Sequence, residues 1–233
     1  MVSPNLLLSK RNIDIVFCID GTGSMSPCIN SVKNNAKRFY SDFAKTMKSM
    51  GSEIDLMRIK VIVFRDYKSD GQNSMVESPF FELPDEDAEF SEYLDGIRAS
   101  GGCNEDANGL EALYLAMKSD FTTGPKDRQL IVLFADTSAI PLLRRGNYPG
   151  YPKDMVNDNG LLETWECMQS RPSKLRERNR RLVIFAPKGS NYEELVQKYK
   201  RSVFTPVQMH RGLDDINFDD IIKIIAASAS SGV

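Results

Sequence analysis

The chain has 233 residues, of which 41% are hydrophobic and 27% are charged, and its formal net charge is −2. This balance is typical of a globular protein with a sizeable core, and the small net charge gives no electrostatic reason to expect nucleic acid or a membrane as a partner. Four scattered cysteines without CxxC spacing and a single histidine argue against a zinc site. The same cysteine usage, and an N-terminus too poor in apolar residues for a signal peptide, predict a cytoplasmic protein.

Apolar runs and helical periodicity alternate along the chain. Buried parallel strands are predicted at residues 13–19, 59–64, 130–135 and 182–186. Helices are predicted at residues 29–50, 90–97, 110–117, 161–168, 192–199 and 218–227. Pro27 suits the first turn of the first helix. Residues 75–83 predict one antiparallel edge strand, because Pro79 would interrupt a central strand.

This alternation predicts a single α/β domain over residues 1–233. We expect a doubly wound, mostly parallel central sheet with helices on both faces, of the Rossmann-like kind. The chain ends, residues 1–11 and 227–233, are expected to be flexible. Residues 144–153, RRGNYPGYPK, predict a long loop after a strand rather than a domain boundary.

The first predicted strand ends in the sequence VFCIDGTGSMSP, residues 16–27. Ligands of open α/β sheets lie at the carboxyl ends of strands, so this loop is a candidate site. A dinucleotide-binding loop is excluded because Ser26 stands where the third glycine is needed. A Walker phosphate-binding loop is excluded because the motif GxxxxGK[ST] does not occur in the chain. An aspartyl-phosphatase loop of the DxDGT type would place Cys18 at the position of the nucleophilic carboxylate, which a buried thiol cannot replace.

A cation site is the remaining chemistry for this loop. Asp20, Thr22 and Ser24 alternate along an extended segment, so their oxygens point to the same side. Such hard oxygen ligands suit Mg²⁺ or Ca²⁺. The helix that follows brings its N-terminus beside the site and favours an anionic partner group. The simpler alternative is a glycine-rich strand-to-helix turn capped by Ser24 or Ser26.

Three segments of the chain together resemble the von Willebrand factor A domain. The residues DGTGSM are similar to the DxSxS motif that opens the metal-ion-dependent adhesion site of this family. The segment SGGCNED, residues 100–106, is similar to its GGGT or GGGD loop, with Asn104 where the family has Thr or Asp. The strand LIVLFADTS, residues 130–138, is similar to the strand ending in the family's TDG aspartate, here Asp136. The phrase FRDY, residues 64–67, is similar to a bacterial, stand-alone subset.

The resemblance implies a bound Mg²⁺, with Mn²⁺ or Ca²⁺ as alternatives. The implied ligands are Asp20, Thr22, Ser24, Asn104 and Asp136, with Glu105, Asp106 and Asp66 as further candidates or as residues behind the ligands. Because Asn104 departs from the family pattern, it is open which of residues 104–106 reaches the metal. For Asp66, a salt bridge with Arg65 or Arg58 is an equally good interpretation.

The function implied by the resemblance is binding without turnover. A partner protein would place an Asp or Glu on the metal, and similar bacterial proteins are associated with kinases and phosphatases in signalling or stress response. We therefore expect a metal-dependent interaction module, not an enzyme, with no nucleic acid or membrane partner. One alternative is a Mg²⁺-dependent phosphoryl-transfer enzyme or hydrolase, because a pair of strand-end aspartates with Mg²⁺ can support that chemistry. Another is a scaffold whose metal site has degenerated through Asn104. His210 is predicted to be a surface or loop histidine rather than a base.

Overall fold

A mixed sheet of seven strands forms the centre of the protein. The computed structural model describes residues 8–101, 106–142, 148–168, 173–211 and 216–231. In these residues the strands are β1 (Ser9–Asp20), β2 (Ser52–Phe64), β3 (Met75–Glu77), β4 (Phe81–Leu83), β5 (Arg128–Phe134), β6 (Arg180–Pro187) and β7 (Ser202–Val207). Their order is β3-β2-β1-β5-β6-β7, with β4 also paired to β2. The two short strands β3 and β4 run antiparallel to β2, and the other pairs are parallel.

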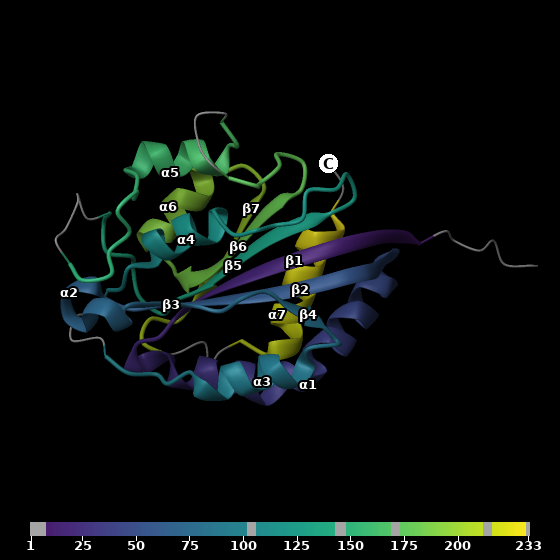
Figure 1. Cartoon of the computed structure of the whole chain (residues 1–233), viewed down its shortest axis with the longest axis horizontal. Helices are drawn as coiled ribbons and strands as arrows, with labels where there is room; N and C mark the ends of the chain where they lie inside the picture. The colour runs from purple at the N-terminus through teal and green to yellow at the C-terminus, as the bar shows by residue number, and fades with distance from the viewer. Residues whose placement is uncertain (1–7, 102–105, 143–147, 169–172, 212–215, 232–233) are drawn as a thin grey trace, which may run out of the picture.

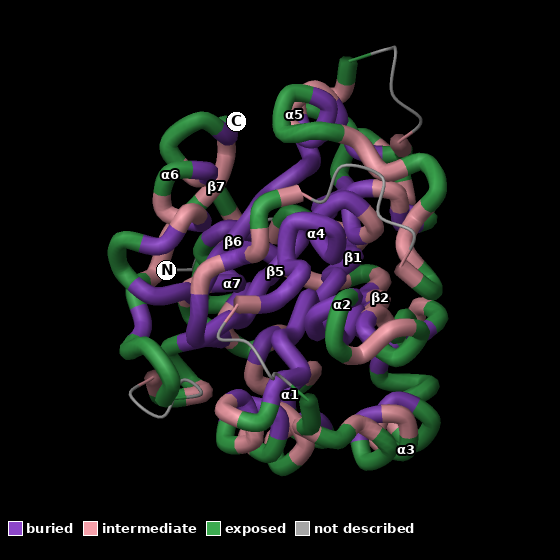
Figure 2. Tube along the Cα trace, turned by 90° about the vertical axis from the view of Figure 1, so that its left-hand side faces the viewer, coloured by how far each residue is buried: buried purple, intermediate pink, exposed green. Residues whose placement is uncertain are grey.

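Helices cover both faces of this sheet (Figure 1). One face carries α1 (Ser26–Ser49), α3 (Asp87–Gly96) and α7 (Phe218–Ser230), and the other carries α4 (Gly109–Met117), α5 (Asp158–Trp165) and α6 (Asn191–Lys198). A short helix, α2 (Tyr67–Asp70), follows β2. Alternate side chains of β1 enter the two cores, Phe17 on the α1 face and Cys18 on the α4 face. The central strands are therefore buried on both sides, as Figure 2 shows, which explains their continuous apolar runs.

The predicted fold class is confirmed, and each of the four predicted strands and six predicted helices has a counterpart. Strand β7 was not predicted, because its residues are mostly half-exposed or exposed at the sheet edge and include Pro206. The single predicted edge strand is two short strands, β3 and β4, on either side of residues 78–80. Helix α7 continues to Ser230 and β1 begins at Ser9, inside the segments expected to be flexible. No helix in the described ranges has both the length and the apolar character needed to cross a membrane.

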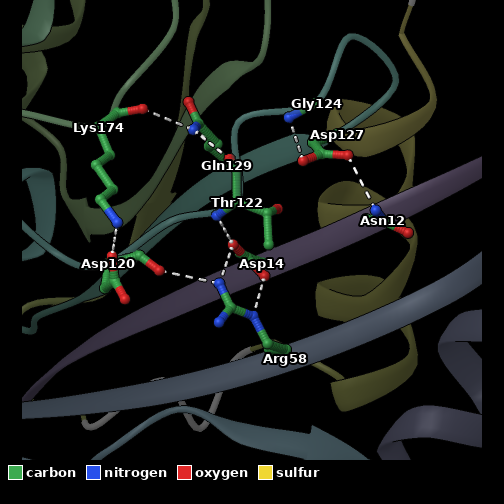
Figure 3. Close-up of polar contacts among 9 residues, drawn as sticks. All are labelled: Asn12, Asp14, Arg58, Asp120, Thr122, Gly124, Asp127, Gln129 and Lys174. Carbon is green, nitrogen blue, oxygen red and sulfur yellow. Dashed lines mark hydrogen bonds and ion pairs between the residues drawn. The ribbon is translucent and has the colours of Figure 1, made fainter.

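The amino-terminal end of the sheet is held by a buried polar cluster (Figure 3). Asp14 of β1 is fully buried, and its carboxylate accepts hydrogen bonds from Arg58 Nε at 2.8 Å and Arg58 Nη2 at 2.7 Å. The backbone N–H of Thr122 donates to the same carboxylate at 2.6 Å. Gln129 links the carbonyls of Thr122 and Lys174 through its amide nitrogen. The cluster thus joins β1, β2 and β5 to two loops at the end of the sheet.

The substitution Asp14→Asn is expected to destabilise the protein strongly. Removing one partner of a buried pair leaves the other charge uncompensated, which costs about 3–5 kcal/mol. Because Arg58 retains a side-chain exposure of 21%, the loss should lie near the lower end of that range. The control is Asp55→Asn, which removes an exposed pair with Lys10 and should change stability by less than about 1 kcal/mol. Urea unfolding measures both, and equal losses would contradict the prediction.

Candidate metal site

The topology brings the ends of β1 and β5 together. Strand β1 lies between β2 and β5, so the chain leaves β1 toward one side of the sheet and later returns on its other side. Such a reversal of strand order opens a crevice at the carboxyl ends of the two strands, where doubly wound proteins bind ligands. Asp20 is the last residue of β1, and Asp136 follows the end of β5. Both carboxylates therefore stand at the switch point of the sheet.

Four of the predicted site residues converge at this point. The hydroxyl of Ser24 donates to Asp136 Oδ1 at 3.1 Å, and Thr22 Oγ1 lies 3.4 Å from Ser24 Oγ. The backbone N–H of Thr22 donates to Asp20 Oδ1 at 2.9 Å. Asp20 and Asp136 are both fully buried, and Thr22 is nearly so. The turn after β1 thus aligns its acid and its two hydroxyls, and β5 supplies the second acid.

The carboxylate of Asp20 is buried and only partly satisfied by hydrogen bonds in this arrangement. Its Oδ2 is buried and has no hydrogen-bond partner among the described residues. Burial raises the pKa of Asp20 to about 7, and the neighbouring Asp136 charge adds to the rise, against the hydrogen bonds from Thr22 and the charge of Arg65. A buried oxygen that lacks a partner is costly, and a bound cation or a proton would relieve that cost.

Arg65 holds the turn from behind. This arginine is nearly buried at the end of β2, and its guanidinium donates to four backbone carbonyls rather than to a carboxylate. Those carbonyls belong to Gly21 at 3.1 Å, Ser100 at 3.0 Å, Asn73 at 3.1 Å and Arg98 at 2.6 Å. A Cβ atom on Gly21 would lie 2.6 Å from Val63 Cγ1 and 2.9 Å from Arg65 Cζ, so only glycine fits there. The arginine therefore joins the turn after β1 to the segments around residues 73 and 98–100.

The remaining predicted residues have different places. Asn104 and Glu105 lie outside the described residues. Asp106 is half-buried just before α4, and its charge acts on the same tyrosine, Tyr192, as the charge of Asp20. Asp66 caps α2, where its carboxylate accepts hydrogen bonds from Lys68 N at 2.9 Å and Ser69 Oγ at 2.7 Å. Among the described residues, the alternative salt bridges of Asp66 with Arg65 and Arg58 are wrong, since Arg65 donates to backbone carbonyls and Arg58 pairs with Asp14.

Sequence reasoning missed a buried polar layer beneath the site. Asn108 accepts a hydrogen bond from Tyr67 N at 2.8 Å and donates to Glu111 Oε1 at 3.0 Å, which also accepts from the Tyr151 hydroxyl at 3.1 Å. Tyr192 of α6 is fully buried, and burial raises its pKa, with the charge of Asp20 as the next cause. No motif marks these residues, because they belong to elements far apart in the chain. Outside them, His210 is exposed as expected, and its backbone N–H donates to the Asp136 carbonyl at 3.0 Å.

The donor set fits a small hard cation. Two carboxylates and two hydroxyl oxygens share one rim, beside the N-terminus of the 24-residue helix α1, whose first turn contains no acid. Mg²⁺ binds through one or two carboxylates plus neutral oxygens and water. Within the described residues, no three Asp, Glu, His or Cys side chains gather in a way that could hold a metal. A cation at this rim would therefore depend on the hydroxyls of Thr22 and Ser24.

Comparisons with known proteins support the fold alone. No protein-family model and no curated protein matches the sequence. The pilus adhesin SpaC of Lactobacillus rhamnosus GG is similar in structure, with a TM-score of 0.53 and 13% identity over 94% of this chain and 31% of the adhesin chain. A von Willebrand factor type A protein from Catenulispora acidiphila gives a TM-score of 0.51 at 13% identity, over 94% of this chain and 43% of that one.

A third similar structure is the proximal thread matrix protein 1 of the mussel byssus, with a TM-score of 0.50 and 13% identity over 96% of this chain and 49% of that chain. The chain thus spans between about a third and a half of these solved chains. At such identities the likeness establishes a von Willebrand factor A-like α/β fold and leaves function to be argued from the site.

The raised pKa of Asp20 predicts a pH dependence of stability in the metal-free protein. The folded state keeps the proton up to about pH 7, whereas the unfolded chain releases it near its ordinary pKa of 3.8. Since the folded state binds more protons in this window, its stability falls as the pH rises from about 4 to about 7. Relative to Asp20→Asn, the wild type should lose on the order of 4 kcal/mol across it. Urea unfolding in EDTA at several pH values tests this, and a pH-independent difference would refute it.

The carbonyl contacts of Arg65 predict that a positive charge at this position is not enough to keep the protein fully stable. Arg65→Lys keeps the positive charge but replaces a planar group of five N–H donors by a compact ammonium, so some of the four carbonyls lose their donor. We expect a loss of about 2–4 kcal/mol in the free energy of unfolding. The matched control is Arg98→Lys, because Arg98 is exposed and, among the described residues, its side chain bonds only to carbonyls of its own turn. The control should stay within about 0.5 kcal/mol. Similar losses in both variants would contradict the role of Arg65.

Proposed function

We propose that the protein is a metal-dependent interaction module. Asp20, Thr22, Ser24 and Asp136 would hold Mg²⁺, with Mn²⁺ or Ca²⁺ as alternatives, and an Asp or Glu of a partner protein would complete its coordination. The observation that carries the proposal is the buried, unpaired Asp20 Oδ2 beside two hydroxyls and a second buried carboxylate. Burying this oxygen without a partner costs free energy, and a bound cation would relieve that cost.

The composition of the rim favours an acidic partner group. Two of the four oxygen donors are neutral hydroxyls, so the protein supplies at most two negative charges to a divalent ion, and few charged ligands suffice for Mg²⁺. The N-terminus of α1 begins next to these hydroxyls, and its partial positive charge adds to the attraction for an anion. A carboxylate from another protein is the anion that this combination would bind without chemical conversion.

The partner is proposed from the sequence resemblance. Bacterial proteins with similar motifs are associated with kinases and phosphatases of signalling or stress-response clusters, and we extend that association to this chain as a cytoplasmic protein. The second candidate is a Mg²⁺-dependent phosphoryl-transfer enzyme or hydrolase, which the pair of strand-end aspartates would allow. The third is a scaffold with a degenerate metal site.

Mg²⁺ is expected to raise the melting temperature of the metal-stripped protein. A ligand that binds only the folded state stabilises it by RT ln(1 + [L]/Kd), about 2.7 kcal/mol at a hundredfold excess over Kd. Asp20→Asn and Ser24→Ala should each abolish the shift, since they remove a proposed ligand. The matched control is Ser26→Ala, which changes a neighbouring serine at the start of α1 and should retain it. Differential scanning fluorimetry with MgCl₂, MnCl₂ and CaCl₂ measures the response.

Two outcomes would count against the proposal. If no divalent ion shifts the melting of the unmutated protein, the degenerate-scaffold alternative is correct. If the protein turns over phosphoester or nucleotide substrates with Mg²⁺, and the Asp20→Asn variant does not, the enzyme alternative is correct. The proposed module requires an ion response and no such turnover.

A further inference from the structure

A groove runs along the edge of the sheet that is formed by β3 and β4, between this edge and α3. It encloses about 820 Å³. Val63, Val76 and Phe81 contribute from the strands, and Glu89, Glu92 and Tyr93 contribute from α3. Ring contacts of Phe81 with Phe90 and Tyr93, at 5.6 and 5.8 Å, hold α3 against β4. Figure 1 shows β3 at this edge of the sheet and α3 on the face below it.

The groove has an apolar floor that is open to solvent. Val76 is 43% exposed, one of five large hydrophobic side chains with such exposure in the described residues. Its strand partner is Val63 of β2, so Val76 faces the α3 side of the sheet. In the described part of the chain, β3 and β4 pair only with β2, and Pro79 separates them. Because each edge strand has only three residues, a partner would be recognised mainly through its side chains rather than as an added strand.

The wall of the groove that α3 forms is acidic. Between Lys68 and Arg98 the chain has nine Asp and Glu residues and no Lys or Arg. Glu89 and Glu92 on the groove wall are exposed, and neither forms an ion pair with another described residue. Arg65 and Arg98 also line the groove and keep their positive charges, since their hydrogen bonds go to neutral backbone carbonyls. The negative charge is therefore local to the wall formed by α3, where Glu89 and Glu92 lie.

We propose that this groove binds a lysine- or arginine-bearing segment of a partner protein. The basic side chains of that segment would face Glu89 and Glu92, and an aliphatic side chain would cover Val76. Opposite charges across such a surface accelerate association and select the partner, while the apolar floor adds burial. Arg65 and Ser100 also line the groove, and Ser100 N donates to the carbonyl of Gly21 at 2.9 Å in the turn that carries Thr22 and Ser24. One partner could therefore occupy both the groove and the rim, but groove binding needs no metal.

The test uses the full chain and a defined probe. A fluorescein-labelled peptide of alternating Lys and Val is titrated in fluorescence anisotropy, in EDTA, with a Glu–Val peptide of equal length as the control. We expect the Lys–Val peptide to bind and the Glu–Val peptide not to bind. The Kd of the Lys–Val peptide should rise about tenfold or more between about 0.05 and 0.5 M NaCl, because exposed charges are screened over that range. Failure of the Lys–Val peptide to bind, or equal binding of both peptides, would overturn the proposal.

Matched variants locate the binding. Glu89→Lys/Glu92→Lys should raise the Kd of the Lys–Val peptide about tenfold or more, and Glu89→Gln/Glu92→Gln should raise that Kd by a smaller factor. The control is Glu177→Lys/Glu194→Lys, which makes the same charge change at exposed positions away from the groove and should change Kd less than about twofold. An equal loss in the control would show attraction by net charge alone. If sedimentation shows wild-type dimers that the groove variant abolishes, the occupant is a second copy of the chain and the proposal is wrong.

Discussion

The guanidinium of Arg65, buried among four backbone carbonyls, is the contact on which the candidate site depends. It joins the turn after β1 to segments near residues 73 and 98–100. Backbone hydrogen bonds from Gly21 N to the Phe64 carbonyl, at 2.8 Å, and from Ser100 N to the Gly21 carbonyl, at 2.9 Å, support the same turn. A planar donor group with fixed geometry is suited to this task, because it can satisfy several carbonyls at once and lose little conformational freedom. Gly21 makes the approach possible, since a side chain there would collide with the arginine. The positions of Asp20, Thr22 and Ser24 follow from this contact together with the end of β1.

The sheet supplies the rest of the arrangement at a cost in electrostatic energy. Parallel strands that are buried on both faces deliver Asp20 and Asp136 to the same crevice, where both are fully buried. The Thr22 N–H donates to Asp20, and the Ser24 hydroxyl donates to Asp136. At the opposite end of the sheet a buried acid, Asp14, is matched by Arg58 and by a backbone N–H. Asp14 therefore has its counter-charge, Arg58, within the chain. The raised pKa of Asp20 indicates a buried carboxylate whose negative charge is not fully compensated by neighbouring groups.

The sequence predicted the parts of this structure that depend on local pattern. Apolar runs located β1, β2, β5 and β6, and the alternation of Asp20, Thr22 and Ser24 predicted that their side chains would share one side of the turn. It could not predict Arg65, because backbone carbonyls have no signature in the sequence. Asp66 was a further candidate from the FRDY resemblance, and its cap of α2 depends on backbone positions that the motif does not specify. The half-exposed β7 lacks a continuous apolar run, and Tyr192 reaches the layer beneath the site from α6, far from the motifs.

The central claim is that a divalent cation binds at the rim formed by Asp20, Thr22, Ser24 and Asp136. A crystal structure of the protein grown with Mn²⁺ tests it most directly, because the anomalous signal of manganese identifies the ion and its position. The claim predicts a single strong peak at this rim, with the Ser24 hydroxyl turned from Asp136 Oδ1 toward the ion. A crystal saturated with Mn²⁺ that shows no peak there, and in which Ser24 still donates to Asp136, would contradict it.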